Sequence, residues 1–273
     1  NATGNYAGSQ MISGNGGQID YTVVQLSGTS VQTAFHEIGH ALGLGHQGPY
    51  NGASSYAADA KYANDSNQLS IMSYWNQTEN TSITASLASL QTPMAVDWLA
   101  LDDLYRNQDF GTNNFGLNNA FNGNTTYGFN TNITNTVSQL YADLATVANS
   151  RAFTIVDGSG IDTVDFSGFS ADQNINLAIA SASSTTGTIS DIGGLTGNMT
   201  IAVGTVIENA ISGSGADQLL GNSSANSLTG GAGDDTLYGY GGNDTLTGGS
   251  GSDSLVGEAG NDPIVAGSGN DTL

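Results

Sequence analysis

Cysteine is absent from the 273-residue chain, so disulfide bonds and thiolate metal sites are both excluded. Any metal must therefore be held by oxygen atoms or by histidine. Basic residues are scarce: 3 Lys and Arg stand against 24 Asp and Glu, for a formal net charge of −21. Neutralising phosphates takes many basic side chains, so nucleic acid is excluded as a partner. No apolar run approaches the ~18 residues that span a bilayer, so we expect no membrane partner.

Glycine and acidic residues are what the chain has in excess. With 39 glycines, only 3 prolines and no three-residue period, the composition indicates repeated tight turns rather than collagen. A net charge of −21 would destabilise a compact chain by self-repulsion, so we expect bound multivalent cations. The first residues show no charged-then-apolar leader, and we expect a soluble mature chain.

Local patterns divide the chain into three stretches and predict an α+β protein. Residues 1–110 hold all three histidines and a helix-like pattern, and we expect the chemistry there. Residues 111–152 are rich in Asn, Thr and Gly and read as a linker, with one short helix predicted over residues 137–147. Residues 153–273 alternate short β-branched runs with Gly, Ser and Asp, which is typical of strands and turns.

A nine-residue period runs from residue 212 to residue 273. Position six reads Asp217, Asn226, Asp235, Asp244, Asp253, Asp262 and Asp271, and position eight reads Leu219, Leu228, Leu237, Leu246, Leu255, Ile264 and Leu273. The period matches the Gly-Gly-x-Gly-x-Asp-x-apolar-x repeat of calcium-binding parallel β-helices. A flexible glycine-rich linker is disfavoured, because such a linker has no reason to keep leucine in register.

The period has a simple geometric meaning. Six residues make a turn and three make a short strand, so two nonapeptides should complete one coil with the eighth position inside. Aspartates one coil apart should then lie above one another along one edge, and about six calcium ions should fit between successive turns. Backbone carbonyls of positions one to four would complete each site. The expected ligands in the repeats are Gly213, Gly215, Asp217, Gly230, Gly231, Ala232, Gly233, Asp235, Tyr240, Gly242, Asp244, Gly248, Gly249, Ser250, Gly251, Asp253, Gly257, Ala259, Asp262, Ala266, Ser268 and Asp271.

One copy, residues 221–229, departs from the repeat. It has Ser224 where the turn favours glycine and Asn226 where the ligand should be charged. We expect the calcium site of this copy to be weaker or empty.

Residues 36–46, His-Glu-Ile-Gly-His-Ala-Leu-Gly-Leu-Gly-His, carry the strongest chemical signal. On a helix, His36 and His40 share a face and can present imidazoles to one ion. Glu37 lies beside that face, where its carboxylate can reach a metal-bound water as general base. Gly43 is placed to end the helix so that His46 can return to the same ion. Three histidines with an open fourth position describe catalytic zinc, whereas unrelated core or surface histidines would have to match this spacing by chance.

A second motif, Ser-Ile-Met-Ser-Tyr-Trp, follows at residues 70–75. Alone, Met72 would be ordinary core packing and Tyr74 an ordinary amphipathic side chain. After the long zinc motif, these residues are instead those of the Met-turn of metzincins.

The chain closely resembles one family, the serralysins, which are secreted zinc endopeptidases of Gram-negative bacteria. The resemblance rests on the zinc motif, the Met-turn, the segments at residues 127–130, 162–169 and 208–211, and the nonapeptides. It implies a partial metzincin protease domain followed by a parallel β-roll of calcium-binding nonapeptide repeats. Zn²⁺ and Ca²⁺ would be the cofactors and polypeptides the substrates. A protein inhibitor or the chain's own missing segments are further partners that it allows, with secretion by a one-step bacterial exporter.

The resemblance also assigns residues that spacing alone does not. Tyr74 would be a further zinc ligand in the resting enzyme and would later donate a hydrogen bond to the oxyanion. Calcium sites in the linker region would use Phe121, Gly123, Thr125, Asp157, Ser159, Gly160, Asp162, Val206 and Glu208. The family usually has Arg where Phe121 stands and Asp where Asn124 stands, and loss of that charge weakens the assignment there.

The ends of the chain differ from the family. Only 35 residues precede His36, whereas serralysins carry more of the upper sheet before it, and the chain stops inside a repeat. We therefore expect a chain truncated at both ends. Two alternatives follow: a fragment that keeps its zinc site but cannot turn over substrate, and a non-catalytic calcium-binding module like those of adhesins and toxins. The zinc motif argues against the second.

Overall fold

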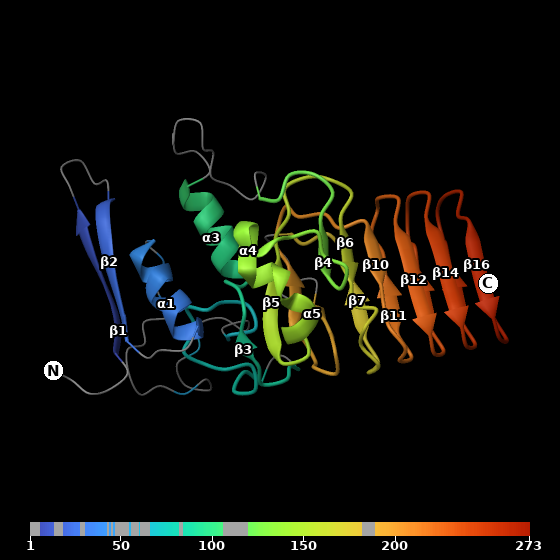
Figure 1. Cartoon of the computed structure of the whole chain (residues 1–273), viewed down its shortest axis with the longest axis horizontal. Helices are drawn as coiled ribbons and strands as arrows, with labels where there is room; N and C mark the ends of the chain where they lie inside the picture. Colours follow the sequence, from blue (N-terminus) through green and yellow to red (C-terminus); the bar gives the residue numbers. More distant parts are fainter. Residues whose placement is uncertain are drawn as a thin grey trace.

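The structure, a computed structural model, is elongated, with a β-hairpin at one end and a stack of short strands at the other (Figure 1). It describes residues 6–13, 19–27, 31–42, 44, 46, 55, 60, 66–81, 84–105, 120–181 and 189–273.

In the N-terminal half, the described residues form a hairpin and two longer helices. Strands β1 (Tyr6–Ser13) and β2 (Ile19–Ser27) pair antiparallel and contact helix α1 (Val31–Ala41). Helix α3 (Ala95–Tyr105) begins after Pro93, where the Asp97 carboxylate accepts the Met94 N–H and so caps the first turn. In the part of the chain that the structure describes, no helix is long and apolar enough to cross a membrane.

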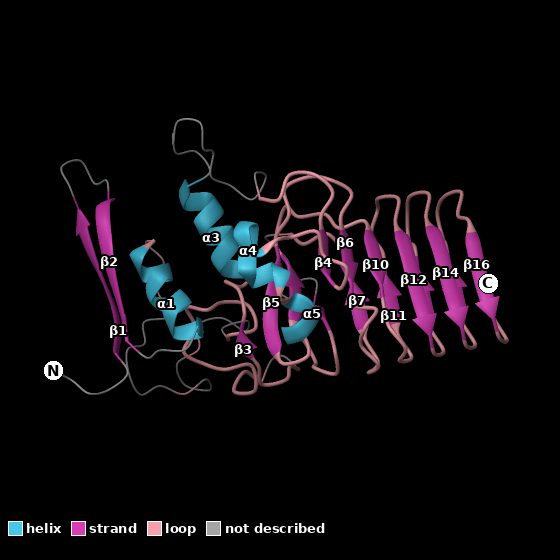
Figure 2. Cartoon of the chain, in the orientation of Figure 1, coloured by secondary structure: helices cyan, strands magenta, loops and turns pink. Residues whose placement is uncertain are grey.

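The C-terminal half is a β-roll with two facing parallel sheets (Figure 2). One sheet contains β4 (Thr126–Gly128), β6 (Thr163–Asp165), β10 (Asn209–Ile211), β12 (Ser227–Ala232), β14 (Thr245–Ser250) and β16 (Ile264–Ser268). The other contains β7 (Asn174–Asn176), β11 (Gln218–Leu220), β13 (Thr236–Tyr238) and β15 (Ser254–Val256). From β10 to β16, successive strands alternate between these two sheets, so each pair of nonapeptides makes one coil.

Strand register confirms the coil that the nine-residue period predicts. Leu228 of β12 lies opposite Leu246 of β14, and Leu237 of β13 lies between Leu219 and Leu255 of its neighbours. These side chains are fully buried between the two sheets. Stacked leucines one coil apart therefore form the hydrophobic core of the roll, and burying each contributes about 1.5–3 kcal/mol.

A third sheet joins the two halves. Strands β3 (Ser89–Leu90), β5 (Arg151–Ile155), β9 (Met199–Ile201) and β8 (Ile189–Ser190) form it in that order. The helix predicted in the linker is present as two short helices, α4 (Asn135–Ala142) and α5 (Leu144–Val147). Their Tyr141 and Leu144 are buried in the same core as the leucines of the roll. Part of the expected linker thus packs with the roll, and the domain boundaries stay a prediction.

Candidate active site and metal centres

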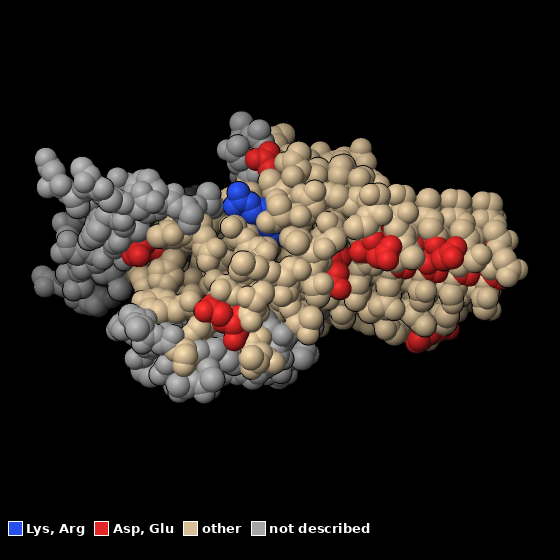
Figure 3. Space-filling model, turned by 90° about the horizontal axis from the view of Figure 1, so that it is seen from below, with Lys and Arg blue, Asp and Glu red and all other residues tan. Residues whose placement is uncertain are grey.

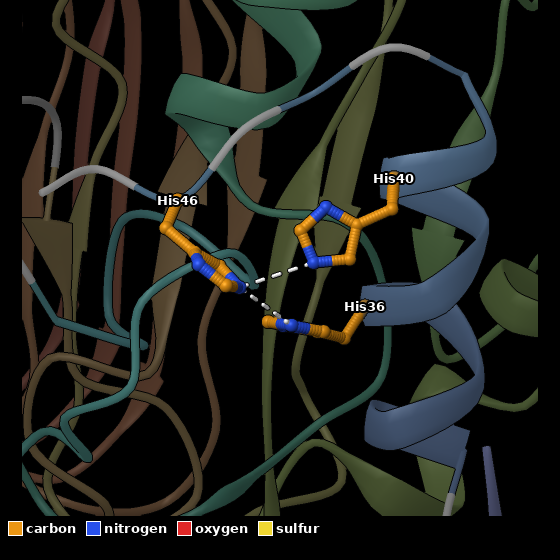
Figure 4. A group of neighbouring side chains, drawn as sticks. All are labelled: His36, His40 and His46. Atoms are coloured by element: carbon orange, nitrogen blue, oxygen red, sulfur yellow. Dashed lines mark hydrogen bonds between the residues drawn. The ribbon is translucent and has the colours of Figure 1, made fainter. Parts of the chain in front are cut away.

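Three histidines converge at the end of α1 (Figure 4). His36 and His40 lie one helical turn apart on α1, and His46 returns to them from the segment that follows. The His46 Nε2 atom is 3.0 Å from His40 Nε2 and 3.3 Å from His36 Nε2. The structure therefore brings together the three residues that the sequence predicts as zinc ligands.

The second ring nitrogens fix the tautomers of two of these histidines. His36 Nδ1 lies 2.8 Å from the Ile71 carbonyl oxygen, and His40 Nδ1 lies 2.9 Å from the Leu44 carbonyl oxygen. Because a carbonyl only accepts, each Nδ1 carries the hydrogen and each Nε2 presents a lone pair to the centre. The lone pairs of His36 and His40 point toward His46 Nε2, where they can accept a hydrogen from that nitrogen or bind a cation among the three rings. Neutral imidazoles in this arrangement suit zinc.

Close packing against the Met-turn holds the histidine-bearing face of α1 in place. A Cβ added at Gly39 would lie 2.5 Å from Met72 Sδ, so any other residue there would force the buried Met72 side chain to shift. Met72 is buried with Leu44, Ile71 and Leu90 in one cluster. The helix ends as expected, with the Leu44 N–H donating to the Gly39 carbonyl, whereas Gly43 lies outside the described residues.

Tyr74 and Glu37 lie next to the histidines. The Tyr74 ring centroid is 4.4 Å from that of His46 and 6.0 Å from that of His36, and Tyr74 is partly exposed. Glu37 follows His36 on α1 and is half-buried. The Tyr74 ring therefore lies beside the histidine rings, whereas Glu37 is placed by its position on α1 next to His36, and the chemical roles of both remain proposals.

Asp97 is a buried carboxylate that the sequence analysis does not single out. Its Oδ1 accepts the Ser70 hydroxyl at 2.7 Å, and its Oδ2 accepts the Ile71 N–H at 2.7 Å and the Met94 N–H at 2.9 Å. Because the Ile71 carbonyl accepts from His36, Asp97 holds the turn that orients this histidine. Burial raises the pKa of the Asp97 carboxyl to about 6, although hydrogen bonds from Ile71, Ser70 and Met94 lower it.

Replacing Asp97 with Asn should remove a pH dependence of stability. The raised pKa favours the protonated, folded form, so the contribution of Asp97 is fully present below pH 4 and is lost as pH rises to about 6. The rise from 3.8 to about 6 corresponds to about 3 kcal/mol at most. Urea unfolding of both proteins from pH 4 to 8, at matched metal concentrations, should show the variant gaining relative stability up to about pH 6. A difference that does not change with pH would contradict this.

The aspartates of the repeats form two ladders, so the expectation of a single edge is wrong. Turns that lead from the six-stranded to the four-stranded sheet carry one ladder (Asp217, Asp235, Asp253 and Asp271). Turns that lead back carry the other, which contains Asn226, Asp244 and Asp262. Consecutive nonapeptides turn at opposite edges because each contains only one strand.

Each ladder is linked by its own side chains. The Asp217 N–H donates to Asp235 Oδ1 at 2.9 Å, the Asp235 N–H to Asp253 Oδ1 at 2.9 Å, and the Asp253 N–H to Asp271 Oδ1 at 3.0 Å. On the other edge the Asp244 N–H donates to Asp262 Oδ1 at 2.9 Å. One carboxylate oxygen of each pair is therefore used by the backbone.

The other carboxylate oxygen is left for a cation. Oδ2 of Asp235, Asp244 and Asp253 is buried and has no hydrogen-bond donor. A Cβ added at Gly230 would touch both Asp235 Oδ2 and the Gly248 carbonyl oxygen, so these two oxygens face one space. Burial raises the pKa of Asp235 to about 7, and the neighbouring Asp217 and Asp253 add to the rise. Buried oxygens that converge without a donor fit Ca²⁺.

The linker-region residues also gather around carboxylates. Asp157 and Asp162 are buried, and the Asp162 N–H donates to Glu208 Oε2 at 2.8 Å. Asp162 Oδ1 accepts the Thr125 N–H at 2.7 Å, and Thr125 Oγ1 lies 3.0 Å from the Gly123 carbonyl oxygen. Burial raises the pKa of Asp157 to about 7, and the nearby charge of Asp162 adds to the rise. Close carboxylates of this kind suit a cation.

Backbone geometry brings most of the remaining linker residues to the same place. Phe121 and Gly123 have positive φ values of 46° and 102°, and the Gly123 N–H donates to the Ser159 carbonyl at 2.6 Å. A Cβ at Gly160 would touch the Gly123 carbonyl oxygen and Asp162 Oδ1. Val206 is half-buried two residues before Glu208.

Comparison with known proteins agrees with this arrangement. Residues 117–273 match the family described as "Peptidase M10 serralysin C terminal", which is more than half of the chain. The chain belongs to the serralysin family. Residues 2–84, which contain the three histidines, match the family described as "Metallo-peptidase family M12".

Individual serralysin relatives extend over most of the chain. The metallopeptidase AprA of Pseudomonas marginalis is 42% identical over 202 residues, covering 71% of this chain and 38% of the relative. Serralysin B of Dickeya chrysanthemi is 46% identical over 192 residues, covering 68% and 35%, respectively. Serralysin of Photorhabdus luminescens is 42% identical over 211 residues, covering 75% and 39%. The chain thus spans less than two fifths of the length of these relatives, and the family implies a metal cofactor.

The departing serralysin repeat is closed by amides rather than by carboxylates. Asn226 Oδ1 accepts the Asn222 N–H at 2.7 Å, and Asn226 Nδ2 donates to the Glu208 carbonyl at 2.9 Å. Asn222 Nδ2 donates to the carbonyls of Leu177 and Ile207. Carbonyl oxygens that accept these amide hydrogens have less need of a cation, which supports the prediction of a weaker or empty calcium site in this copy.

Position five of the repeat has a structural use that the sequence analysis missed. Asp234 Oδ1 accepts the Ser252 N–H at 2.7 Å, and Asn243 Oδ1 accepts the Asn261 N–H at 2.9 Å. The signal was present, because Asp and Asn recur at this position in several copies. Figure 3 shows that acidic side chains form a row along the roll.

Proposed function

We propose that this chain carries the catalytic zinc site and the calcium-binding roll of a secreted endopeptidase that hydrolyses peptide bonds in proteins. The convergence of three imidazole Nε2 atoms on one point, with Glu37 beside them on α1, carries the proposal. His36, His40 and His46 would hold Zn²⁺, with Tyr74 as a further ligand in the resting state.

The residues divide the chemistry among them. Zinc at this site would supply a Lewis acid that polarises the scissile carbonyl and lowers the pKa of a bound water. Glu37 takes the proton of the attacking water and passes it to the leaving nitrogen. Tyr74 donates a hydrogen bond to the carbonyl oxygen as negative charge develops on it. Met72 packs against the face of α1 that carries His36 and His40, and Asp97 orients His36 through Ile71.

A need for calcium would make folding of the roll depend on whether the chain is inside or outside the cell. A roll whose carboxylates need Ca²⁺ folds poorly where calcium is scarce, so export through a one-step bacterial exporter would precede folding. The substrate would be a polypeptide, as expected for a serralysin relative.

Metal analysis and a protein substrate test the proposal together. Elemental analysis should find about one zinc per chain, and a zinc-selective chelator in calcium-containing buffer should abolish cleavage of casein until zinc is returned. His46→Ala should lose most of the zinc. One zinc without cleavage would instead support the fragment hypothesis, and no zinc at the histidines would contradict the enzyme assignment.

A further inference from the structure

Gln68 lies at a contact between the zinc half and the roll. It belongs to the loop that carries Met72, and its side chain is fully buried. Its Nε2 donates to the Gly197 carbonyl oxygen at 3.0 Å, across 129 residues of sequence. Three residues after Gln68, the Ile71 carbonyl accepts from His36 Nδ1. One short loop therefore contacts both a zinc-ligand candidate and the roll side of the molecule.

Gly197 is tied in turn to the first strand of the four-stranded roll sheet. Its N–H donates to Asp191 Oδ1 at 2.6 Å. Asp191 exchanges two backbone hydrogen bonds with Asn174 of β7, at 2.8 and 3.0 Å. β7 pairs directly with β11, which follows the turn of Asp217. Displacement of the Asp217 turn would therefore reach Gly197 through strand hydrogen bonds and the Asp191 carboxylate.

The contact at Gly197 is tight. Gly197 has a φ of +64°, and an added Cβ would touch the Gln68 amide and lie 3.1 Å from the Thr84 carbonyl oxygen. Beside it, the Ser86 N–H donates to the Thr196 carbonyl at 2.7 Å, and the Thr196 N–H donates to Ser86 Oγ at 2.9 Å. A tightly packed contact of this kind transmits a shift of one side to the other.

We propose that Gln68 is a positioning residue through which the calcium-loaded roll holds the Met-turn, so that calcium binding raises the zinc affinity of the histidine site. The inference rests on the proposed zinc site but concerns a different property, the coupling between the two metals. Coupling of this kind is reciprocal, so zinc must raise calcium affinity by the same factor.

Gln77 provides a matched control for a test of Gln68. It too is buried, its Nε2 donates to a backbone carbonyl, that of Ala88, at 2.9 Å, and its Oε1 also lacks a partner. Its hydrogen bond stays within the zinc half, because both residues precede α3. Gln68→Met and Gln77→Met therefore remove equivalent amides, but only the first one breaks the link to Gly197.

The experiment measures zinc affinity of the whole chain in saturating calcium and in calcium-depleted buffer, by competition with a zinc-binding dye. Wild-type affinity should rise at least about five-fold with calcium. In Gln68→Met, the ratio of zinc affinity with calcium to zinc affinity without calcium should be about five-fold smaller than in wild type, because the loss of one hydrogen bond has about that effect. In Gln77→Met, this ratio should be the same as in wild type. The spectrum of cobalt in place of zinc should show a calcium dependence that only Gln68→Met lacks.

Glycine variants keep the test decisive if Gln68→Met does not fold. Gly197→Ala disrupts the contact with Gln68 from the roll side. Gly204→Ala is its control, because it imposes similar backbone strain at φ +90° but has no atom within 4 Å of the added Cβ. Only Gly197→Ala should lower the coupling.

Several outcomes would overturn the inference: wild-type zinc affinity that ignores calcium, unchanged coupling in Gln68→Met, or equal losses in each matched pair. Protein that couples the two metals but cleaves no peptide would contradict the proposed function alone.

Discussion

Glu37→Gln is expected to reduce peptide hydrolysis by about 10²–10⁴-fold while the protein keeps its zinc. The amide has nearly the shape of the carboxylate but cannot take a proton from the attacking water. Because Glu37 is not one of the three converging ligands, the histidines should still bind the metal. Initial rates on a quenched peptide, with zinc content measured on the same samples, would give both quantities.

Glu79→Gln is the control for this change. Glu79 is exposed and accepts the Asn76 N–H at 2.8 Å in the loop after the Met-turn. The same chemical substitution there should alter turnover by less than about two-fold, since surface changes away from special features have small effects. Wild-type turnover in Glu37→Gln, or loss of zinc in proportion to activity, would show that the residue is not the general base.

Removal of calcium is expected to unfold the coils from β11 to β16. Residues 153–273 contain no Lys or Arg, so the stacked carboxylates have no basic partner in their own half of the chain. At neutral pH their repulsion should exceed the stabilisation from the leucine stack, and the free energy of calcium binding becomes folding free energy. Hydrogen exchange should show the amides of β13 and β14 protected in calcium and exchanging rapidly without it. Protection that persists without calcium would refute this account.

Adjacent residues of one turn offer a matched pair for the calcium effect. Asp235 is buried with an unpartnered Oδ2, whereas its neighbour Asp234 is exposed and caps the Ser252 N–H. Asp235→Asn should raise the calcium concentration at the folding midpoint by about ten-fold or more, because ligand charge sets calcium affinity. Asp234→Asn should shift it by less than about two-fold. Equal shifts would mean that overall charge, rather than ligation, drives folding.

Periodic and local features could be predicted from the sequence. Coil length and the buried leucines followed from the nine-residue period, because similar copies stack in similar ways. The predicted three-residue strand is present in β11, β13 and β15, but β12 and β14 are six residues long. The histidine cluster followed from helical spacing, since His36 and His40 had to share a face whatever surrounded them.

Contacts between distant segments could not be predicted in this way. Spacing carries no sign that Asp97 holds the Ser70 turn, or that Gln68 reaches Gly197, because both depend on how separate elements dock. The two ladders were missed for a simpler reason. The aspartates of both nonapeptides of a coil were assigned to one edge, whereas the two turns of each coil lie at opposite edges and join Asp217 to Asp235 on one and Asp244 to Asp262 on the other.

A coil of eighteen residues also restricts how such a protein can change in length. Gain or loss of a whole coil keeps the register in which leucines one coil apart pair, as Leu228 pairs with Leu246. It also keeps the contacts within each aspartate ladder. Gain or loss of a single nonapeptide sends each later turn to the opposite edge and each later strand to the opposite sheet. Changes of whole coils should therefore be tolerated best within the roll, because every later strand keeps its sheet and every later turn keeps its edge.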